Sequence, residues 1–408
     1  DEVSKLLYST DASLYQIKPC GVAAPRDRED VINAVKIAAR HQVPLIGRGG
    51  GTSLAGQTIT TGLVLDLSKY MNEVLEVNEE EHWARVQPGI VLDNLNAYLK
   101  PYGLFFAPDV ATASRANVGG MLGNNSSGVR SVKYGKTVDH VLELSVVLSS
   151  GEDFQFRKLK QSELEEKCAS GGREGALYSA ISSIVEENRD EIVKRFPKVM
   201  RRVSGYNLDE LLDPDQFNLA KLMVGSESTL GVVTEAKVNL VPIPTYTMLA
   251  VLHFDDLLEA IRAVQDILKY DPSAVEIMDR YGLELGRDNP VVSELCNQFI
   301  HKEPDAILIV EFSDDDLEAL RSRFEAMSAD PGVRERTFHC YEAWETAAQQ
   351  VVWQVRKNAL GVMLGIKGDF KPLPFIEDSC IPVEHLAEYV EKVQKICDSK
   401  NREMALYA

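Results

Sequence analysis

The chain has 408 residues, of which 45% are hydrophobic and 26% charged, the composition of an ordinary globular protein. Its length suggests two or three domains. Asp and Glu outnumber Lys and Arg by 62 to 44. The resulting net charge of -18 argues against a protein that binds nucleic acid by neutralising phosphates. No stretch approaches the run of about 18 apolar residues that a membrane-spanning helix needs, and no apolar leader opens the chain.

Six cysteines are spread along the chain, and none belongs to a Cys-x-x-Cys pair. We therefore expect six reduced thiols in a cytoplasmic protein, without a disulfide scaffold, zinc site or iron–sulfur site in this chain. The chain begins at Asp1 rather than Met and stops at Tyr407-Ala408. We read this as a fragment of a longer protein.

The first elements alternate between helix and strand. Apolar residues recur at i, i+3, i+4 and i+7 between residues 28 and 41, which predicts a helix. Short apolar runs predict strands at 43–46 and 63–67, separated by a glycine-rich loop over 47–56.

A longer apolar run at 141–148 predicts another strand, which a turn joins to 154–156. Pro242 and Pro244 then interrupt the chain, and we predict a domain boundary there. This gives two domains, 1–242 and 243–408.

The second half contains a repeated pattern of a strand followed by a helix. Strands are predicted at 247–254 and 306–312, and each following helix ends at an Asp-Pro pair, 59 residues apart. The pattern predicts an antiparallel, ferredoxin-like sheet backed by helices. Two unrelated α/β units that match by coincidence would give the same pattern.

Short polar residues are expected to cap these helices. Asp255-Asp256 precedes the first helix, and Ser313 and Asp314 precede the second. A further helix is predicted after Pro382, where apolar residues again recur at helical spacing.

The sharpest local motif is Gly47-Arg48-Gly49-Gly50-Gly51-Thr52-Ser53, which directly follows a predicted strand. Consecutive glycines allow positive φ and expose backbone amides, so such a loop can hold an anion. It is no Walker A loop, because the Gly-Lys-Ser/Thr ending is missing, and a strand rather than a helix follows it. By itself, the motif is compatible with a phosphate site and with a tight glycine turn.

Two further segments are rich in small residues. Residues 113–128 read ASRANVGGMLGNNSSG, with Arg115 as their one charged residue. We expect no core element there, but a backbone wrapped closely around an extended polar ligand, with a flexible loop as the alternative. Residues 225–234 lead into a strand that ends near Leu240, and a glycine turn at a strand entry explains them equally well.

Five ordered motifs together resemble the FAD-binding domain of the vanillyl-alcohol oxidase / p-cresol methylhydroxylase (PCMH) superfamily. They are residues 48–53, Gln87-Pro88-Gly89, Pro108-Asp109, residues 117–128 and residues 225–234. Within it, residues 18–408 resemble the FAD-linked D-2-hydroxyacid dehydrogenases and oxidases, which include D-lactate dehydrogenase, the glycolate oxidase flavin subunit and D-2-hydroxyglutarate dehydrogenase. The run Gly123 to Gly128 followed by Tyr134-Gly135 is most like the long bacterial form, which carries a fused iron–sulfur region.

The resemblance implies an α+β fold with a two-part PCMH-type FAD-binding domain and an antiparallel ferredoxin-like cap domain that is truncated at its C-terminal end. It implies that FAD binds non-covalently, because Thr52 stands where covalent members often carry a nearby histidine. Residues 48–53 would hold the pyrophosphate. The implied FAD-binding residues are Arg48, Gly49, Gly50, Gly51, Thr52, Ser53, Pro88, Gly89, Pro108, Ser114, Gly119, Gly120, Asn124, Ser126, Ser127, Gly128, Glu227, Gly231, Val232 and Val233.

Two basic residues are candidates for substrate binding. Arg356 follows Trp353, and an arginine offers parallel donors to a carboxylate. Without the resemblance, a surface salt bridge would explain this arginine at least as well. The resemblance implies that Arg356 binds the substrate carboxylate and that Lys371 is a second anion contact. Leu360 departs from the 2-hydroxyglutarate branch, where a hydroxyl residue is common.

The implied activity is oxidation of a D-2-hydroxy acid of the 2-hydroxyglutarate, lactate or glycolate class to the 2-oxo acid, by hydride transfer to flavin N5. The electrons would pass to an iron–sulfur region, a quinone or an electron-transfer protein. A divalent metal and an iron–sulfur cluster are expected in parts of the protein outside this chain.

Two other functions stay open at this stage. An FAD-binding subunit that only relays electrons and a non-redox FAD enzyme of the same superfamily would share these motifs. A homo-oligomer and peripheral attachment to the inner membrane are also left open, whereas nucleic acid is not an expected partner.

Overall fold

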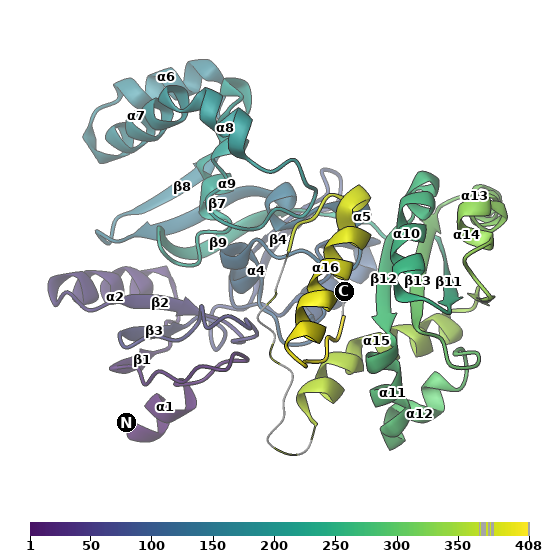
Figure 1. The fold of residues 1–408 in the computed structure, drawn as a ribbon. Helices are drawn as coiled ribbons and strands as arrows, with labels where there is room; N and C mark the ends of the chain where they lie inside the picture. Colours follow the sequence, from purple (N-terminus) through teal and green to yellow (C-terminus); the bar gives the residue numbers. More distant parts are fainter. Residues whose placement is uncertain (367, 369–372, 374–375, 377–378, 407–408) are drawn as a thin grey trace. The chain divides into compact units, whose positions relative to one another are not determined.

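The computed structural model describes the whole chain except residues 367, 369–372, 374–375, 377–378 and 407–408 (Figure 1). The chain forms two compact units, each built from several segments. The first unit comprises Asp1–Gly128, Lys136–Lys198 and Arg202–Ile243. The second comprises Val129–Gly135, Val199–Arg201 and Pro244–Ala408. The short segment 129–135 therefore belongs to the second unit, although residues of the first unit flank it in the sequence.

A small parallel sheet opens the first unit. Its strand order is β1-β3-β2, with bounds Gly21–Ala23, Leu63–Asp66 and Leu45–Arg48. Helix α2 (Arg28–Arg40) connects β1 to β2, and Asp27 caps its N-terminus through the backbone N–H of Asp30. Its apolar face buries Val31 and Val35, as the helical spacing predicted. Strand β2 begins two residues later than predicted and includes Arg48.

An antiparallel sheet of five strands forms the rest of the first unit's scaffold. Its order is β4-β5-β9-β7-β8, with bounds Val74–Asn78, Trp83–Val86, Gly231–Asn239, Val141–Leu148 and Asp153–Arg157. Strand β7 matches the predicted run 141–148 residue for residue. Strand β9 alternates buried and half-buried residues, and it follows the third glycine segment as predicted. A two-stranded ribbon pairs β6 (Leu104–Phe105) with β10 (Val241–Pro242).

The helices of the first unit lie along or beside these sheets. Besides α2 they are α1 (Glu2–Leu7), α3 (Leu92–Leu99), α4 (Val118–Asn124), α6 (Gln161–Ala169), α7 (Gly172–Glu187), α8 (Arg189–Arg195) and α9 (Leu219–Met223). Helix α4 corrects the prediction that residues 113–128 form no core element. Val118, Met121 and Leu122 are spaced as one helical face and are buried, and Asn125 ends the helix in the left-handed conformation.

The second unit is built on an antiparallel sheet with strand order β12-β13-β11-β14 (Figure 1). The strands are Ala274–Asp279, Ala306–Asp314, Tyr246–Phe254 and His339–Ala343. Helix α10 (Leu257–Ile267) follows β11, and α13 (Leu317–Ala329) follows β13. Asp316 caps α13, rather than the predicted Ser313 or Asp314, because β13 continues to Asp314.

Helices cover both faces of this sheet. One face packs Met248, Phe254 and Phe312 with residues of α10, α13 and α16 (Leu386–Ser399). The other face packs Leu249, Val251 and Ile309 with residues of α11 (Arg280–Asp288), α12 (Pro290–Cys296) and α15 (Thr346–Leu364). The short helices α5 (Ser131–Tyr134) and α14 (Pro331–Arg334) complete the unit. The prediction of mixed α and β structure is confirmed.

Within the described residues, none of the helices has the length and apolar character of a membrane span. All six cysteines lie in the described part of the chain, and no disulfide joins any two of them there.

Candidate functional site

The first glycine loop packs directly on the second small-residue segment. A Cβ atom at Gly49 would lie 2.7 Å from Oδ1 of Asn117. At Gly50 it would lie 2.3 Å from the carbonyl oxygen of Arg115. A side chain at either position would therefore collide with residues 115–117, so the glycines allow the two motifs to approach each other.

Arg48 holds this loop to the N-terminal segment of the first unit. Arg48 is 9% exposed, and its guanidinium donates to the carbonyl oxygens of Tyr8, at 3.1 Å, and Thr10, at 2.7 Å. Burial lowers the pKa of Arg48, against the opposing effect of the nearby Asp11 carboxylate. Gly51 has φ +63°, and a Cβ there would lie 2.7 Å from the Arg48 guanidinium. The predicted contact of Arg48 with a pyrophosphate stays a prediction, while its role in ordering the loop is visible.

The Pro88-Gly89 motif meets the start of α4. The amide of Asn117 donates to the carbonyl oxygen of Gly89, and the N–H of Gly119 donates to that of Pro88 at 2.7 Å. A Cβ at Gly119 would lie 2.7 Å from Cβ of Pro88. The first glycine loop, the Pro88-Gly89 motif and the start of α4 thus meet around Asn117, although they are far apart in the sequence.

The end of the second segment is fixed by its own contacts. A Cβ at Gly128 would lie 1.7 Å from the carbonyl oxygen of Asp109, next to the buried Pro108. The amide of Asn124 donates to Oγ of Ser126 at 3.0 Å. Thr52, Ser53, Ser114 and Ser127 are at least partly accessible in the described structure.

The third segment reaches both of the others. The N–H of Glu227 donates to the carbonyl oxygen of Gly123 at 3.0 Å, and Gln57 donates to the Glu227 carboxylate at 3.2 Å. Oγ of Ser228 lies 3.6 Å from where a Cβ at Gly47 would sit. Glu227 and Ser228 have φ values of 47° and 63°. Such left-handed residues cost about 1–3 kcal/mol each and cluster at functional sites.

The predicted residues on strand β9 also have structural roles. A Cβ at Gly231 would lie 2.8 Å from the carbonyl oxygen of Val147, and the Val232 side chain is buried against α2 and β3 residues. Val233 is half-buried and packs on the larger core of the first unit. Close packing within the protein accounts for the identity of these residues without a ligand.

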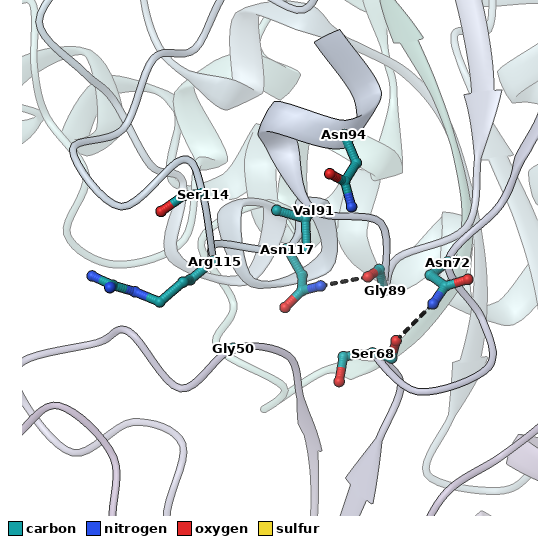
Figure 2. Close-up of a pocket in the computed structure, with 9 residues that line it drawn as sticks. All are labelled: Gly50, Ser68, Asn72, Gly89, Val91, Asn94, Ser114, Arg115 and Asn117. Carbon is teal, nitrogen blue, oxygen red and sulfur yellow. Dashed lines mark hydrogen bonds between the residues drawn. The ribbon is translucent and has the colours of Figure 1, made fainter. Parts of the chain in front are cut away.

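A pocket of about 550 Å³ lies where these motifs meet (Figure 2). Its lining is mostly backbone, hydroxyl and amide groups. The lining residues are Gly50, Ser68, Asn72, Gly89, Val91, Asn94, Ser114, Arg115 and Asn117. Figure 2 shows Asn72 donating to the Ser68 carbonyl oxygen, at 2.9 Å, and Asn117 donating to Gly89.

Three of the predicted FAD-binding residues, Gly50, Gly89 and Ser114, line this pocket. Sequence reasoning missed Ser68, Asn72 and Asn94. Ser68 and Asn72 follow strand β3, and Asn94 lies in helix α3, outside the glycine motifs. Their only sequence signal is a polar residue just after a buried strand or inside an apolar helix, which is too common to identify a site.

The second predicted site lies in the second unit. Nε of Arg356, on α15, donates to Oε2 of Glu276, on β12, at 2.7 Å, and Nη2 contacts the same oxygen. The side chains are 8% and 6% exposed. Arg356 is therefore a buried, ion-paired residue rather than a surface arginine. Lys371 lies outside the described residues.

The sequence matches known protein families in two consecutive regions. Residues 19–156 match the FAD binding domain, and residues 243–408 match the C-terminal domain of FAD linked oxidases. Together, the two matches cover most of the chain.

The similarity to curated proteins extends over nearly the whole length of the chain. The chain is 37% identical to D-2-hydroxyglutarate dehydrogenase of Pseudomonas putida, over 98% of this chain and 40% of that protein. It is 29% identical to glycolate oxidase subunit GlcD of Bacillus subtilis, over 96% of this chain and 71% of that protein. A solved structure of alkyldihydroxyacetonephosphate synthase shares the fold, with a TM-score of 0.62 at 18% identity, over 87% of this chain and 61% of that one. The chain thus spans about 40% of the length of the first of these relatives.

The first unit has three features that fit an extended, polar cofactor. The pocket volume lies in the usual range for ligand sites, about 300–1,000 Å³. Gly120 offers a second observation, because a Cβ there would meet nothing within 4 Å, in contrast to its neighbour Gly119. The third is Asn125, which is fully buried and whose Nδ2 has no hydrogen-bond partner in the described structure, while its Oδ1 accepts from the N–H of Val138. Open space and an unsatisfied donor are both features that a bound cofactor would use.

Proposed function

We propose that this chain is the FAD-binding and substrate-binding part of an enzyme that oxidises a D-2-hydroxy acid to the corresponding 2-oxo acid. The observation that carries the proposal is that two family matches in series, an FAD-binding domain and an oxidase C-terminal domain, cover most of the chain. Relatives named D-2-hydroxyglutarate dehydrogenase and glycolate oxidase subunit GlcD support it. When bound, FAD supplies the chemistry of this reaction by accepting the hydride of the substrate Cα–H.

In this proposal, residues 1–242 are the FAD-binding domain, and FAD is held without a covalent bond. Gly50, Gly89 and Ser114 contact it in the pocket, together with the amides of Asn94 and Asn117. The other FAD-binding residues predicted from the sequence act either by direct contact with the cofactor or by joining the loops that make the pocket. The lining is rich in hydroxyl and amide groups and includes Arg115, which supports a polar, anionic cofactor bound through hydrogen bonds and one positive charge.

Residues 243–408 are proposed to be the substrate-binding cap domain. The strand order β12-β13-β11-β14, with a helix after β11 and another after β13, supports a ferredoxin-like topology for it. Arg356 is proposed to bind the substrate carboxylate, with Glu276 fixing the orientation of its guanidinium. Lys371 is proposed as a second anion contact.

Other parts of the machinery are proposed to lie outside this chain. The P. putida relative is more than twice as long as this chain. We assign the base that takes the hydroxyl proton, a divalent metal and the route to the electron acceptor to residues outside it. That acceptor would be an iron–sulfur region, a quinone or an electron-transfer protein. The six cysteines without a disulfide among them support a reducing, cytoplasmic compartment.

Product analysis tests this proposal. The full-length protein, which includes the residues beyond this chain, is supplied with FAD and a dye as electron acceptor and receives the D or the L form of 2-hydroxyglutarate or lactate, or the achiral glycolate. We expect one 2-oxo acid, trapped as its hydrazone, to form in proportion to reduced dye, and from a chiral substrate only in the D form. Protein that holds FAD but yields no 2-oxo acid would contradict the proposal and favour an electron relay or a non-redox enzyme.

A further inference from the structure

A short segment from the first half of the sequence supplies charged side chains to the sheet of the second unit. Residues 129–135 follow directly after Gly128, the last residue of the second glycine motif, and belong to the second unit. Nζ of Lys133 donates to Oγ of Ser313 at 2.9 Å, near the end of β13. Arg130 lies in the same segment. The segment is thus anchored on β13 by its basic residues.

Arg130 forms a two-point ion pair with a buried carboxylate. Its Nε donates to Oε1 of Glu311 at 2.6 Å, and its Nη2 donates to Oε2 at 2.7 Å. The Glu311 side chain is 3% exposed, whereas that of Arg130 is 27% exposed. A pair of parallel hydrogen bonds fixes the plane of a guanidinium, and in this case the guanidinium remains partly accessible.

This ion pair lies on the same sheet face as that of Arg356 and Glu276. In the register of β12 and β13, Ala274 lies opposite Glu311 and Glu276 lies opposite Ile309. Residues directly opposite share a face, and so do residues two apart along a strand. Glu276 and Glu311 therefore point to one face of the sheet, where each holds one arginine.

Trp353 connects the two arginines. It precedes Arg356 by three residues on α15, so the two side chains are on neighbouring positions of one helix face. The Arg130 guanidinium carbon lies 5.6 Å from the centre of the Trp353 ring, a cation–π distance. The second unit thus gathers Arg130 and Arg356 around one tryptophan.

We propose that Arg130 determines specificity by binding the distal carboxylate of a dicarboxylic 2-hydroxy acid, while Arg356 binds the carboxylate beside the hydroxyl. The inference rests on the proposed function. Glu276 and Glu311 hold the guanidinium groups of the two arginines in fixed orientations, so little side-chain entropy is lost when an anion binds. With Lys133, the three basic residues outnumber the two acids by one, so the cluster keeps a net positive charge and favours an anionic ligand. A site built for a second carboxylate discriminates against an acid that lacks it.

A matched pair of substrates tests this inference. D-2-hydroxyglutarate and D-2-hydroxybutyrate differ only in that a hydrogen replaces the distal carboxylate. Glutarate and butyrate are the matching pair without the hydroxyl, and their dissociation constants can be measured calorimetrically without turnover. The variants are Arg130→Lys, which keeps the charge but loses the fork, and the double variant Arg130→Gln/Glu311→Gln, which leaves no unpaired buried charge.

Arg323→Gln is the control variant. Arg323 lies in the same unit, is 24% exposed and forms an ion pair of 2.6 Å with Asp314. It reports the general effect of losing a half-buried ion pair in this unit.

In the double variant, we expect kcat/KM for D-2-hydroxyglutarate and the affinity for glutarate to fall about 10- to 100-fold, the size of a lost charge-assisted hydrogen bond. In the Arg130→Lys variant, both of these values should fall by less. The kcat/KM for D-2-hydroxybutyrate and the affinity for butyrate should change by less than about threefold. The Arg323→Gln variant should leave the values for both members of each pair unchanged. Equal losses for both members of a pair, or no loss for the dicarboxylates, would overturn the inference. If the full-length wild type oxidises none of the 2-hydroxy acids, D-lactate and glycolate included, but glutarate binding still depends on Arg130, the proposed function fails and the inference about Arg130 stands.

Discussion

Arg356 and Glu276 are 80 residues apart in the sequence and form a buried ion pair on one face of the second unit's sheet. Both side chains are less than a tenth exposed, so neither charge is solvated by bulk water. A guanidinium held in this way has a defined direction. Because both charges are buried, each residue can remain charged in the folded protein only while its partner is present.

The first prediction concerns this dependence. Removal of one partner leaves an uncompensated charge in the interior, so Glu276→Leu should lower the free energy of unfolding by about 3–5 kcal/mol. Replacement of both residues, by Arg356→Met/Glu276→Leu, should cost much less, because no charge remains buried. Urea unfolding of the wild type, the single variants and the double variant gives the comparison. If the double variant is as unstable as the sum of the single ones, the two residues are not coupled.

The second prediction uses the open space at Gly120. Gly120→Ala adds a methyl group within helix α4 at a point where, apart from the backbone of the helix itself, no atom of the described residues lies within 4 Å. The apo protein should keep its stability or gain up to about 1 kcal/mol, because alanine favours a helix. FAD affinity should fall by about tenfold or more if the cofactor packs there, since added volume at a filled contact costs about 1–3 kcal/mol.

Gly361→Ala is the matched control for this experiment. Gly361 also lies in a helix, α15, and a Cβ there also meets nothing within 4 Å. Fluorescence titration of the apo protein with FAD measures both variants. Unchanged FAD affinity in Gly120→Ala would show that the space beside α4 is solvent rather than cofactor.

The third prediction concerns a glycine whose role is internal. A Cβ at Gly128 would lie 1.7 Å from the carbonyl oxygen of Asp109, and a backbone atom cannot move aside as a flexible side chain can. Gly128→Ala should therefore destabilise the first unit by about 1–3 kcal/mol or more, with or without FAD. Thermal unfolding of apo and FAD-loaded protein measures this. A variant of normal stability that merely loses FAD would instead assign Gly128 to direct cofactor contact.

The fourth prediction is a pH dependence that arises at His253. This side chain is fully buried, its Nε2 accepts from the N–H of His301 at 3.1 Å, and its Nδ1–H donates to the carbonyl oxygen of Val251 at 3.0 Å. Burial, with the nearby His339 ring, lowers its pKa from 6.5 to about 4. The unfolded chain therefore binds a proton at higher pH than the native state does. The contribution of His253 to the free energy of unfolding is fully present above about pH 6.5. It decreases as the pH falls toward 4, by about 3 kcal/mol in total.

His253→Gln keeps an acceptor for the His301 amide but cannot titrate. The variant should be less stable than the wild type at pH 7, and its free energy of unfolding should change less between pH 7 and 4.5. Denaturant unfolding at several pH values measures both slopes, and all other titrating groups are common to the two proteins. Parallel slopes would show that His253 does not set this dependence.

Elements with strong apolar periodicity could be predicted well from the sequence. Strand β7 and helix α2 agree with their predicted positions because each has one regularly spaced buried face. Helix α4 was missed, since glycines and amides mask its three buried residues, Val118, Met121 and Leu122. Its stability comes from packing against the rest of the first unit rather than from helix propensity.

Pairings between distant residues could not be predicted in the same way. The motif that contains Arg48 was visible, but the contact of its guanidinium with Tyr8 and Thr10 depends on the path of the N-terminal segment. The partner of Arg356 was equally hidden, because one of many acidic residues, Glu276, becomes its neighbour only when α15 packs on the sheet. For the same reason, the position of Asn94 in the pocket could not be predicted from the sequence.

An anaerobic visible spectrum of the full-length protein, before and after separate additions of D-2-hydroxyglutarate, D-lactate and glycolate, tests the proposed activity most directly. We predict flavin absorption bands that one of these acids bleaches, and, if that acid is chiral, that its L enantiomer leaves unchanged. Flavin bands that none of these acids bleaches would contradict the proposed oxidation of a D-2-hydroxy acid. Failure to bind FAD at all, even when it is added in excess, would contradict the assignment of the glycine loops and the pocket between them to the cofactor.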